Sequence, residues 1–424
     1  MDPSEVDCTS VPRYKRTPEE DRLWRLASAH GIGRRSFLQL LAAGGATAVL
    51  AACSGVPSPT SIATATPSSG TNASAAWFKD PDPFIKHEGS LEARLENIKG
   101  LITPNRFFFV RNNSGSVAVD SKAWRLKVEG DGVSSALELS YDQIVNMPSR
   151  TVVAYVECAG NQRAMFDMVN GQKTKGTQWG RGGVGNGEWT GASLGDVLRE
   201  AGVKEEARSV LLVGLDLGAP ENGFRRALPL DKAMQPDTLL AYGMNGEVLP
   251  EDHGFPLRAI VPGWIGASSI KWLDRIVVST KAFWTRNNTT HYVLIGDEYQ
   301  EEGEADGEVI TTQVVKSALA LPWPAEVPAG PRQLYGYAHS SDGPITKVQW
   351  SADSGRMWNE AEISGPQVQY SWARFEFTWE ATPGQHTIMT RATDSRGNTQ
   401  PESTPFNYRG YLFNQPLPHP IRVT

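Results

Sequence analysis

The sequence predicts an α+β fold, in which a mixed and irregular body is followed by an Ig-like β-sandwich. Three observations support this prediction. Between positions 77 and 307, segments with helical periodicity alternate with short β-branched runs. Beyond position 308, apolar and polar residues alternate as they do in half-buried strands. The 41 glycines and 13 tryptophans indicate a loop-rich body rather than a helical bundle.

Residues 1–53 carry the features of an export signal. The stretch 33–38 contains the pair Arg34-Arg35 of a twin-arginine pattern, and the apolar run 40–52 is shorter than the roughly 20 residues that span a membrane. The run ends in Leu-Ala-Ala-Cys, which is similar to a lipoprotein cleavage box. Cys53 is therefore expected to become a lipidated N-terminus, with ordinary cleavage nearby as the alternative. Residues 54–76 are rich in Ser, Thr, Ala and Pro and predict a flexible linker.

Helices in the body, residues 77–307, are predicted from capping residues that precede apolar periodicity. Ser140 and Gln143 form a capping-box pattern. Ser193 is expected to cap a helix that Gly202 ends, and Ser90 a helix that continues to Gly100. The apolar faces of these two helices would be Leu194, Val197, Leu198 and Ala201, and Leu91, Leu95 and Ile98. Strands are predicted at 151–153, 210–213 and 259–261.

The region 308–424 has the pattern of a sandwich of short strands. Phe375, Phe377 and Trp379 alternate with polar residues, and a second strand is expected at 386–393. Turn sequences at 353–355 and 394–398 follow strand candidates. Short strands at this spacing predict a β-sandwich of Ig size.

Composition excludes some classes of function. A formal net charge of −6 without a basic stripe argues against a nucleic-acid partner. The three cysteines, Cys8, Cys53 and Cys158, allow no disulfide framework once the leader is removed. The chain has no Cys-x-x-Cys-His motif for haem attachment, and no flavin domain is expected.

Cys158 is the main candidate for chemistry. It follows the strand-like run 151–153 and precedes the turn sequence Ala-Gly-Asn, so it can be presented at a strand end. A thiolate is a good ligand for a soft or redox-active metal, and Arg163 nearby would lower its pKa. The alternative is a buried cysteine that acts as a small hydrophobic residue.

Three further clusters accompany Cys158. The stretch 103–112 places Arg111 after an apolar strand that includes Phe109, and the stretch 252–258 holds His253 and Arg258 around a turn. The stretch 263–272 is a glycine-rich loop with Ser269 and Lys271. Each has an ordinary explanation as a strand end, a loop histidine or a solvated lysine. Together they supply the cations and amides that a large anionic cofactor requires.

In this order, the clusters resemble the sulfite oxidase family of molybdenum enzymes, from about residue 101 to the C-terminus. The resemblance implies that the Cys158 thiolate binds molybdenum beside the dithiolene of one molybdopterin. It also implies an Ig-like dimerisation domain after the cofactor domain, and hence a homodimer. The positions matched to family site residues are Phe109, Arg111, Arg163, Asp216, His253, Arg258, Ser269 and Lys271 for the cofactor, and Arg111, Tyr292 and Arg374 for substrate. A core aromatic is the alternative for Tyr292.

The resemblance implies oxidation of sulfite to sulfate, with electrons passed to a separate acceptor such as a c-type cytochrome. Neither haem nor flavin is expected in this chain. The twin-arginine signal implies a periplasmic location or the outer face of the cytoplasmic membrane, with contact to the membrane only through a lipid on Cys53. The alternatives are the molybdenum subunit of a sulfane dehydrogenase, another oxyanion oxidoreductase of the family, and a non-catalytic exported binding protein. Gln162, Asn113 and Ser268 depart from the family pattern and bear on the choice of substrate.

Overall fold

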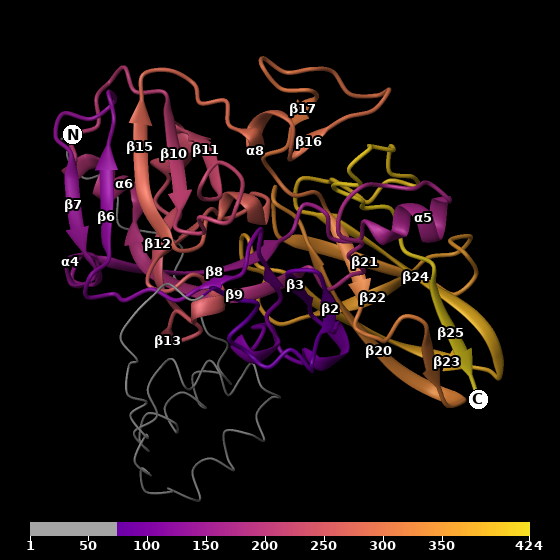
Figure 1. Cartoon of the computed structure of the whole chain (residues 1–424). Helices are drawn as coiled ribbons and strands as arrows, with labels where there is room; N and C mark the ends of the chain where they lie inside the picture. The colour runs from indigo at the N-terminus through magenta and orange to yellow at the C-terminus, as the bar shows by residue number, and fades with distance from the viewer. Residues whose placement is uncertain (1–73) are drawn as a thin grey trace, which may run out of the picture. The chain divides into compact units, whose positions relative to one another are not determined.

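The computed structural model describes residues 74–424, which Figure 1 shows in colour. The predicted export signal, its cleavage box and the linker as far as residue 73 lie outside the described residues. Within residues 74–424, no helix combines the length and the apolar character needed to cross a membrane.

The first large sheet has five strands in the order β11-β10-β15-β6-β7 (Figure 1). Its strands pair antiparallel except β15 and β6, which run parallel. The strand predicted at 210–213 is confirmed, because β10 covers it. The strand bounds are Arg125–Glu129 for β6, Leu137–Ser140 for β7, Ser209–Gly214 for β10, Arg225–Pro229 for β11 and Leu273–Ser279 for β15.

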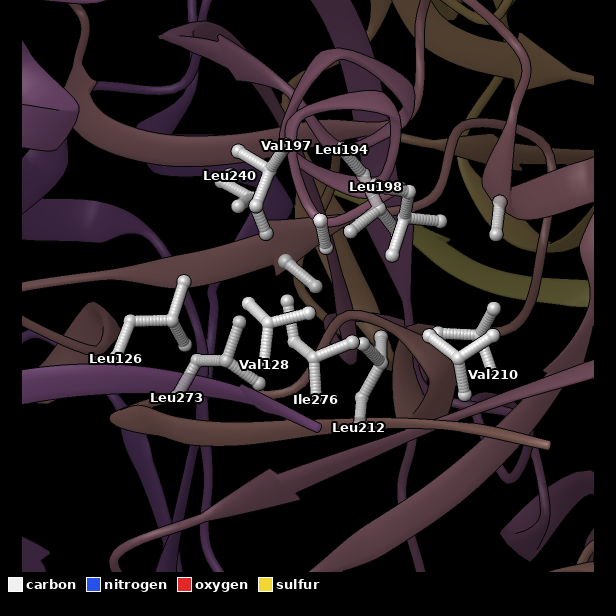
Figure 2. Packing of buried hydrophobic residues seen from close by; sticks show 14 of the residues in the cluster. Leu126, Val128, Leu194, Val197, Leu198, Val210, Leu212, Leu240, Leu273 and Ile276 are labelled. Carbon is white, nitrogen blue, oxygen red and sulfur yellow. The ribbon is translucent and has the colours of Figure 1, made fainter. Parts of the chain in front are cut away.

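Helix α6 (Leu194–Glu200) covers one face of this sheet with its apolar side. Figure 2 shows Leu194, Val197 and Leu198 directed toward sheet residues that include Leu212 and Ile276. All five side chains are fully buried. Full burial gives an apolar side chain its largest favourable contribution to the free energy of folding. The helix predicted after Ser193 is confirmed by this packing.

The helix ends agree only in part with the predicted caps. The capping box is confirmed: the Gln143 N–H donates to Ser140 Oγ (3.2 Å), and the Ser140 N–H donates to Gln143 Oε1 (2.9 Å) at the start of α4 (Tyr141–Val145). Ser193 precedes α6 in an extended conformation but makes no side-chain cap bond. Gly202 adopts a left-handed φ of 66° just beyond the helix, as a terminating glycine should.

The helix predicted from Ser90 is wrong. Ser90–Glu92 form strand β3, and the chain then makes only a 3-10 turn, η1 (Leu95–Asn97). The buried Glu92 carboxylate accepts hydrogen bonds from the amides of Gly180 (2.9 Å) and Gly182 (3.1 Å). These tertiary bonds favour the extended conformation and override the local apolar periodicity.

A second sheet, in the order β13-β12-β9-β8 with β14 beside β12, leads to the site. Strand β8 (Ser149–Glu157) contains the run predicted at 151–153, and Cys158 follows it directly. The strand predicted at 259–261 overlaps β14 (Arg258–Ile260). The other members are Val184–Ser193 for β9, Leu239–Met244 for β12 and Glu247–Val248 for β13.

Beyond residue 308 the described chain is strand and loop. The strand order is β18-β20-β23-β22-β21-β24-β25-β19, and Phe375, Phe377 and Trp379 lie in its core. The predicted strand-rich character is confirmed, whereas the predicted domain boundaries stay a prediction. The strands are Lys316–Leu319 (β18), Ala325–Val327 (β19), Gly330–His339 (β20), Ile345–Ser351 (β21), Asn359–Ser364 (β22), Ala373–Ala381 (β23), Gly384–Asp394 (β24) and His419–Val423 (β25).

Helices are short throughout the described residues. Helices α5 and α6 have 7 residues each, whereas β24 has 11. The predicted α+β class is therefore only partly right, because the structure is mostly β. The remaining elements are β1 Ser74–Ala75, β2 Ile85–His87, η2 Asn105–Phe107, β4 Val110–Arg111, β5 Ser116–Val117, α5 Ala164–Asn170, α7 Leu230–Ala233, η3 Glu251–His253, η4 Gly266–Ser268, α8 Arg286–Thr289, β16 Val293–Leu294 and β17 Glu308–Val309.

Candidate active site

Two cavities meet at Cys158. The first, called the inner cavity, is lined mostly by buried residues and contains nearly all of the site residues predicted from the sequence. The second, called the outer cavity, has several cations in its lining, most of them at least partly exposed. The predicted residues that line the inner cavity are Phe109, Arg111, Cys158, Asp216, His253, Arg258, Ser269, Lys271 and Tyr292. The outer cavity shares Arg111, Cys158 and Tyr292 and adds Arg163, Lys175, Trp179, Arg286, His291, Arg409 and Tyr411.

Cys158 lies at the point where strand β8 ends. Its amide donates to the Gly183 carbonyl (2.8 Å), and its carbonyl accepts from the Asn161 amide (2.8 Å). Its side chain is 9% exposed and borders both cavities. The thiol is thus buried among apolar neighbours, as in the alternative interpretation, but it also faces the space in which a ligand could bind.

Glu157 fixes this strand end. Its fully buried carboxylate accepts hydrogen bonds from Asn161, Lys316 and His339, each 2.9 Å long. Burial raises the pKa of Glu157, but the Lys316 ammonium and the His339 ring outweigh burial and lower that pKa to about 2. The residue before Cys158 is therefore a carboxylate held by two strands beyond residue 308.

One end of the inner cavity is strongly cationic. Arg258 donates from Nη1 to the His253 carbonyl (3.1 Å) and from Nη2 to the Ser269 carbonyl (2.9 Å), whereas its buried Nε has no partner. Lys271 Nζ donates to the Asp252 carbonyl (2.8 Å) and to Asn112 Oδ1. Lys79, which sequence reasoning missed, reaches the same place and lies 2.8 Å from His253 Nε2.

The lowered pKa values of these groups reflect the free-energy cost of burying several cations close together. Burial lowers the pKa of Arg258 to about 9 and that of Lys79 to about 7. Burial also holds the pKa of Lys271 and of His253 well below their usual ranges, and the neighbouring cations add to the effect on His253. A bound anion would relieve this cost, so the donor set fits a phosphate group. Asp216, whose pKa burial raises, accepts from the Phe224 amide (2.8 Å) on the same cavity.

Tyr292 stands between the cavities. Its ring stacks on Tyr411 with centroids 5.5 Å apart, and the Arg226 guanidinium lies 5.4 Å from its centroid. Burial raises the pKa of Tyr292 to about 12, although the Arg111 cation opposes this shift. The phenol is therefore neutral at physiological pH and can donate a hydrogen bond. Tyr292 packs in a small buried cluster, as the alternative of a core aromatic describes, but it also lines both cavities.

Arg163 lies in the outer cavity and does not line the inner one. Its Nε donates to the Arg409 carbonyl (2.6 Å) and its Nη1 to the Thr177 carbonyl (2.7 Å). Arg163 therefore reaches the cavity that Cys158 borders from the outer side, and a contact with the cofactor stays a prediction. The side chain joins two loops of the outer cavity, because Nε and Nη1 bind backbone carbonyls of different segments.

Arg374 lines neither cavity. It projects from β23 on the face opposite Phe375 and pairs with Glu376 (2.6 Å) and with Ser364 Oγ (3.0 Å). The two-residue period of the strand puts Arg374 and Glu376 on one face, where Nη1 of Arg374 binds the carboxylate, whereas its buried Nε has no partner among the described residues. The arginine that the region beyond residue 308 contributes to the outer cavity is Arg409.

Several cations of the site were missed in the sequence. Most of them lie in irregular segments, where no periodicity marks a residue as buried or facing a cavity. Arg286 begins the short helix α8, and Arg226 is a fully buried residue of β11, the edge strand of the first sheet. The missed residues are Lys79, Lys175, Arg226, Arg286, His291, Arg409 and Tyr411.

Comparison with known proteins places this geometry in a family. Residues 114–286 match the model of an oxidoreductase molybdopterin binding domain, and residues 308–422 match a Mo-co oxidoreductase dimerisation domain. The chain is 36% identical over 329 residues to sulfite oxidase of Gallus gallus, with 73% of this chain and 71% of the relative covered. It is 35% identical over 368 residues to mitochondrial sulfite oxidase of Drosophila melanogaster, with 80% and 63% covered.

A solved structure gives the same result. The sulfane dehydrogenase SoxCD from Paracoccus pantotrophus superposes with a TM-score of 0.70 at 26% identity, with 87% of this chain and 96% of that chain covered. The chain spans 63% of the length of its Drosophila relative and 60% of the human one. The sequence similarity, the two matched domains and the shared fold together show that this chain belongs to the sulfite oxidase family of molybdopterin-dependent oxidoreductases.

Proposed function

We propose that the chain oxidises sulfite to sulfate at Cys158. The observation that carries this proposal is the position of the thiol, which faces both a cavity with a cationic, phosphate-sized end and a cavity lined by arginines. The first suits a bound anionic cofactor, and the second suits a small oxyanion that enters from water. The two-electron reaction consumes water and releases two protons, with sulfur as the atom oxidised.

The cofactor would be molybdopterin with one molybdenum. Cys158 would bind the metal, Arg258, Lys271 and His253 would bind the phosphate, and Asp216 would contact the pterin. The orphaned Nε of Arg258 and the low pKa values around it fit an anion at this end. When bound, this group supplies the electron and oxygen-atom transfer, and the protein residues bind, orient and tune the reactants.

The substrate would bind in the outer cavity. Arg111, Arg409, Arg286 and Lys175 line it, and none of them forms a salt bridge among the residues that the structure describes. The guanidinium groups of the three arginines suit a pyramidal or tetrahedral oxyanion, because forked donors match its oxygens. Tyr292, neutral at physiological pH, would donate to a substrate oxygen and assist the movement of protons to water.

The electrons would leave to a separate acceptor, such as a c-type cytochrome. The twin-arginine pattern supports export, with the site at the periplasm or at the outer face of the cytoplasmic membrane. The match to a dimerisation domain supports a homodimer joined through an Ig-like second domain.

The test is a ferricyanide-coupled sulfite assay on protein expressed in a host that makes molybdopterin, combined with elemental analysis. We expect close to one molybdenum per chain and sulfite-dependent reduction of ferricyanide. Purified protein with full molybdenum content and no turnover of sulfite would refute the substrate.

A sulfane dehydrogenase activity is the second candidate, because the fold of SoxCD covers most of this chain. In that case the substrate would be sulfur carried on a protein, and free sulfite would be a poor competitor. Turnover of a protein-bound sulfane substrate at a higher kcat/KM than sulfite would establish this alternative.

A further inference from the structure

The segment that enters the described chain, residues 74–84, lies against the cationic end of the inner cavity. It begins with β1, which pairs with β5 and matches Ala75 to Ser116. The amides of Phe78 and Lys79 then donate to the carboxylate of Asp252, at 3.1 and 2.8 Å. Ser116 Oγ donates to the same carboxylate (2.6 Å). The segment is therefore tied to Asp252, the residue next to His253.

The side chain of Lys79 passes inward from this segment. Its ammonium donates to the carbonyls of Asn105 (2.9 Å) and Phe108 (2.8 Å) and lies 2.8 Å from His253 Nε2. An ammonium has three donors and no acceptor, so His253 Nε2 is the acceptor and its proton is on Nδ1. Lys79 thereby uses all three donors and sets the tautomer and the orientation of a ring that lines the inner cavity.

Lys79 also decides the charge of this end. Without it, the cations Arg258 and Lys271 face the carboxylates Asp252 and Asp216, and these charges balance. Lys79, whose pKa is about 7, makes the set net positive when it is protonated, and a bound anion favours that form. The pKa of His253 stays well below its usual range because of burial and the neighbouring cations. A phosphate monoester, which carries about −1.5 to −2 charges at neutral pH, would be retained better by the set that includes Lys79.

We propose that Lys79 is a positioning residue for the phosphate end of the cofactor and that the bound cofactor holds segment 74–84 more firmly at this end. The inference rests on the proposed cofactor and names a residue and a segment that act on its retention. Lys79 acts through His253 and through the backbone of 105–108, since it does not line the cavity itself. The stability of the segment and retention of the cofactor are linked, because the same segment supplies the amides to Asp252 and the ammonium to His253.

The first test needs no variant. Hydrogen–deuterium exchange is measured for peptides that cover 74–84, in wild-type protein loaded with cofactor and in protein from a host unable to make molybdopterin. We expect slower exchange in the loaded protein at the amides of Phe78 and Lys79. Equal exchange in both forms would overturn the coupling between the segment and the cofactor.

The second test compares Lys79→Met and Lys79→Arg with the control Lys86→Met. Lys86 lies just beyond this segment, in β2, and its half-exposed side chain pairs with Asp82 (2.9 Å). We expect Lys79→Met to lose molybdenum and pterin roughly 10-fold faster on dialysis, as other outer-shell changes do, with partial rescue in Lys79→Arg and no change in the control. Retention in Lys79→Met equal to wild type would overturn the role of Lys79.

Failure of this inference can be told apart from failure of the proposed function. Sulfite turnover per bound molybdenum is measured on the wild type alone. A wild type that holds cofactor but does not oxidise sulfite refutes the proposed substrate and leaves both retention tests valid. A wild type that holds no pterin in a competent host refutes the cofactor and this inference together.

Discussion

The inner and outer cavities both collect positive charge, but they hold it in different ways. In the inner cavity Arg258 and Lys271 bind backbone and amide oxygens and lie beside Asp252, so the cations are fixed before any ligand arrives. In the outer cavity Arg409 and Arg286 are partly exposed to water, and Arg286 donates to the His291 ring (2.7 Å). Buried, fixed cations suit a ligand retained through many turnovers, whereas partly exposed cations suit an anion that exchanges with water.

Cys158 joins the two cavities, so its substitution has the largest expected effect. Cys158→Ser replaces a soft thiolate with a hydroxyl that binds molybdenum poorly. We expect turnover of sulfite to fall by more than about 100-fold, since a metal ligand matters more than an outer-shell partner. Molybdenum and pterin are measured on the same samples, and pterin should remain because the phosphate end is intact. Full turnover in this variant would refute Cys158 as the ligand.

The inner cavity is tested next by removing a fixed cation. Arg258→Met should leave its carbonyl partners at His253 and Ser269 unpaired and remove a charge from the phosphate end. We expect the pterin content of purified protein to fall roughly 10- to 100-fold, with a smaller change in turnover per remaining molybdenum. The exposed Arg150, on the same strand as the run before Cys158, provides the control Arg150→Met. An unchanged pterin content in Arg258→Met would place the phosphate elsewhere.

The same contrast explains what the sequence could predict. The sequence predicts most of the polar residues that line the inner cavity. Phe109, His253 and Lys271 lie in stretches whose strand, turn and glycine patterns indicate their local structure. The sequence does not predict most residues that line the outer cavity, because Arg409 and Lys175 come from irregular segments that long-range packing brings to Cys158. Local patterns describe local structure, so they miss contacts made between distant loops.

The fold divides along similar lines. The capping box at Ser140 and the helix after Ser193 depend on neighbouring residues, and both were predicted. The segment after Ser90 depends on the Glu92 carboxylate meeting amides 88 and 90 positions away, and its predicted helix is a strand and a turn. Arg374 has a different, local reason for lying outside the cavities: Glu376, two residues on along β23, binds it on the strand face away from Phe375.

A matched pair of arginines sharpens the assignment of the outer cavity. Arg409 lines this cavity, whereas Arg374 lies outside it and pairs with Glu376. We expect Arg409→Gln to raise KM for sulfite about 10-fold, because a charge-assisted hydrogen bond contributes on the order of 1.5–3 kcal/mol. Molybdenum content should stay the same, and Arg374→Gln should leave KM unchanged. The opposite result, with Arg374→Gln raising KM, would restore the role predicted for Arg374 from the sequence.

The smallest expected effect concerns His291 and depends on pH. Burial, followed by the cations Arg409, Arg286 and Lys175, lowers the pKa of His291 from 6.5 to about 4. The ring is therefore neutral at physiological pH and becomes a further cation only as pH falls through about 4. Protonation would add positive charge to the outer cavity and favour binding of an anion, so kcat/KM should gain a few-fold in that range.

The variant His291→Gln isolates this contribution. The ratio of wild-type to variant kcat/KM cancels the protonation of sulfite itself, which affects both proteins equally. We expect the ratio to be flat through neutral pH and to rise only as the medium approaches the pKa of about 4. An inflection of this ratio near pH 6.5, the ordinary pKa of histidine, would contradict the desolvated environment of His291. It would mean that water reaches His291 freely and that the outer cavity is more open than its packing of cations indicates.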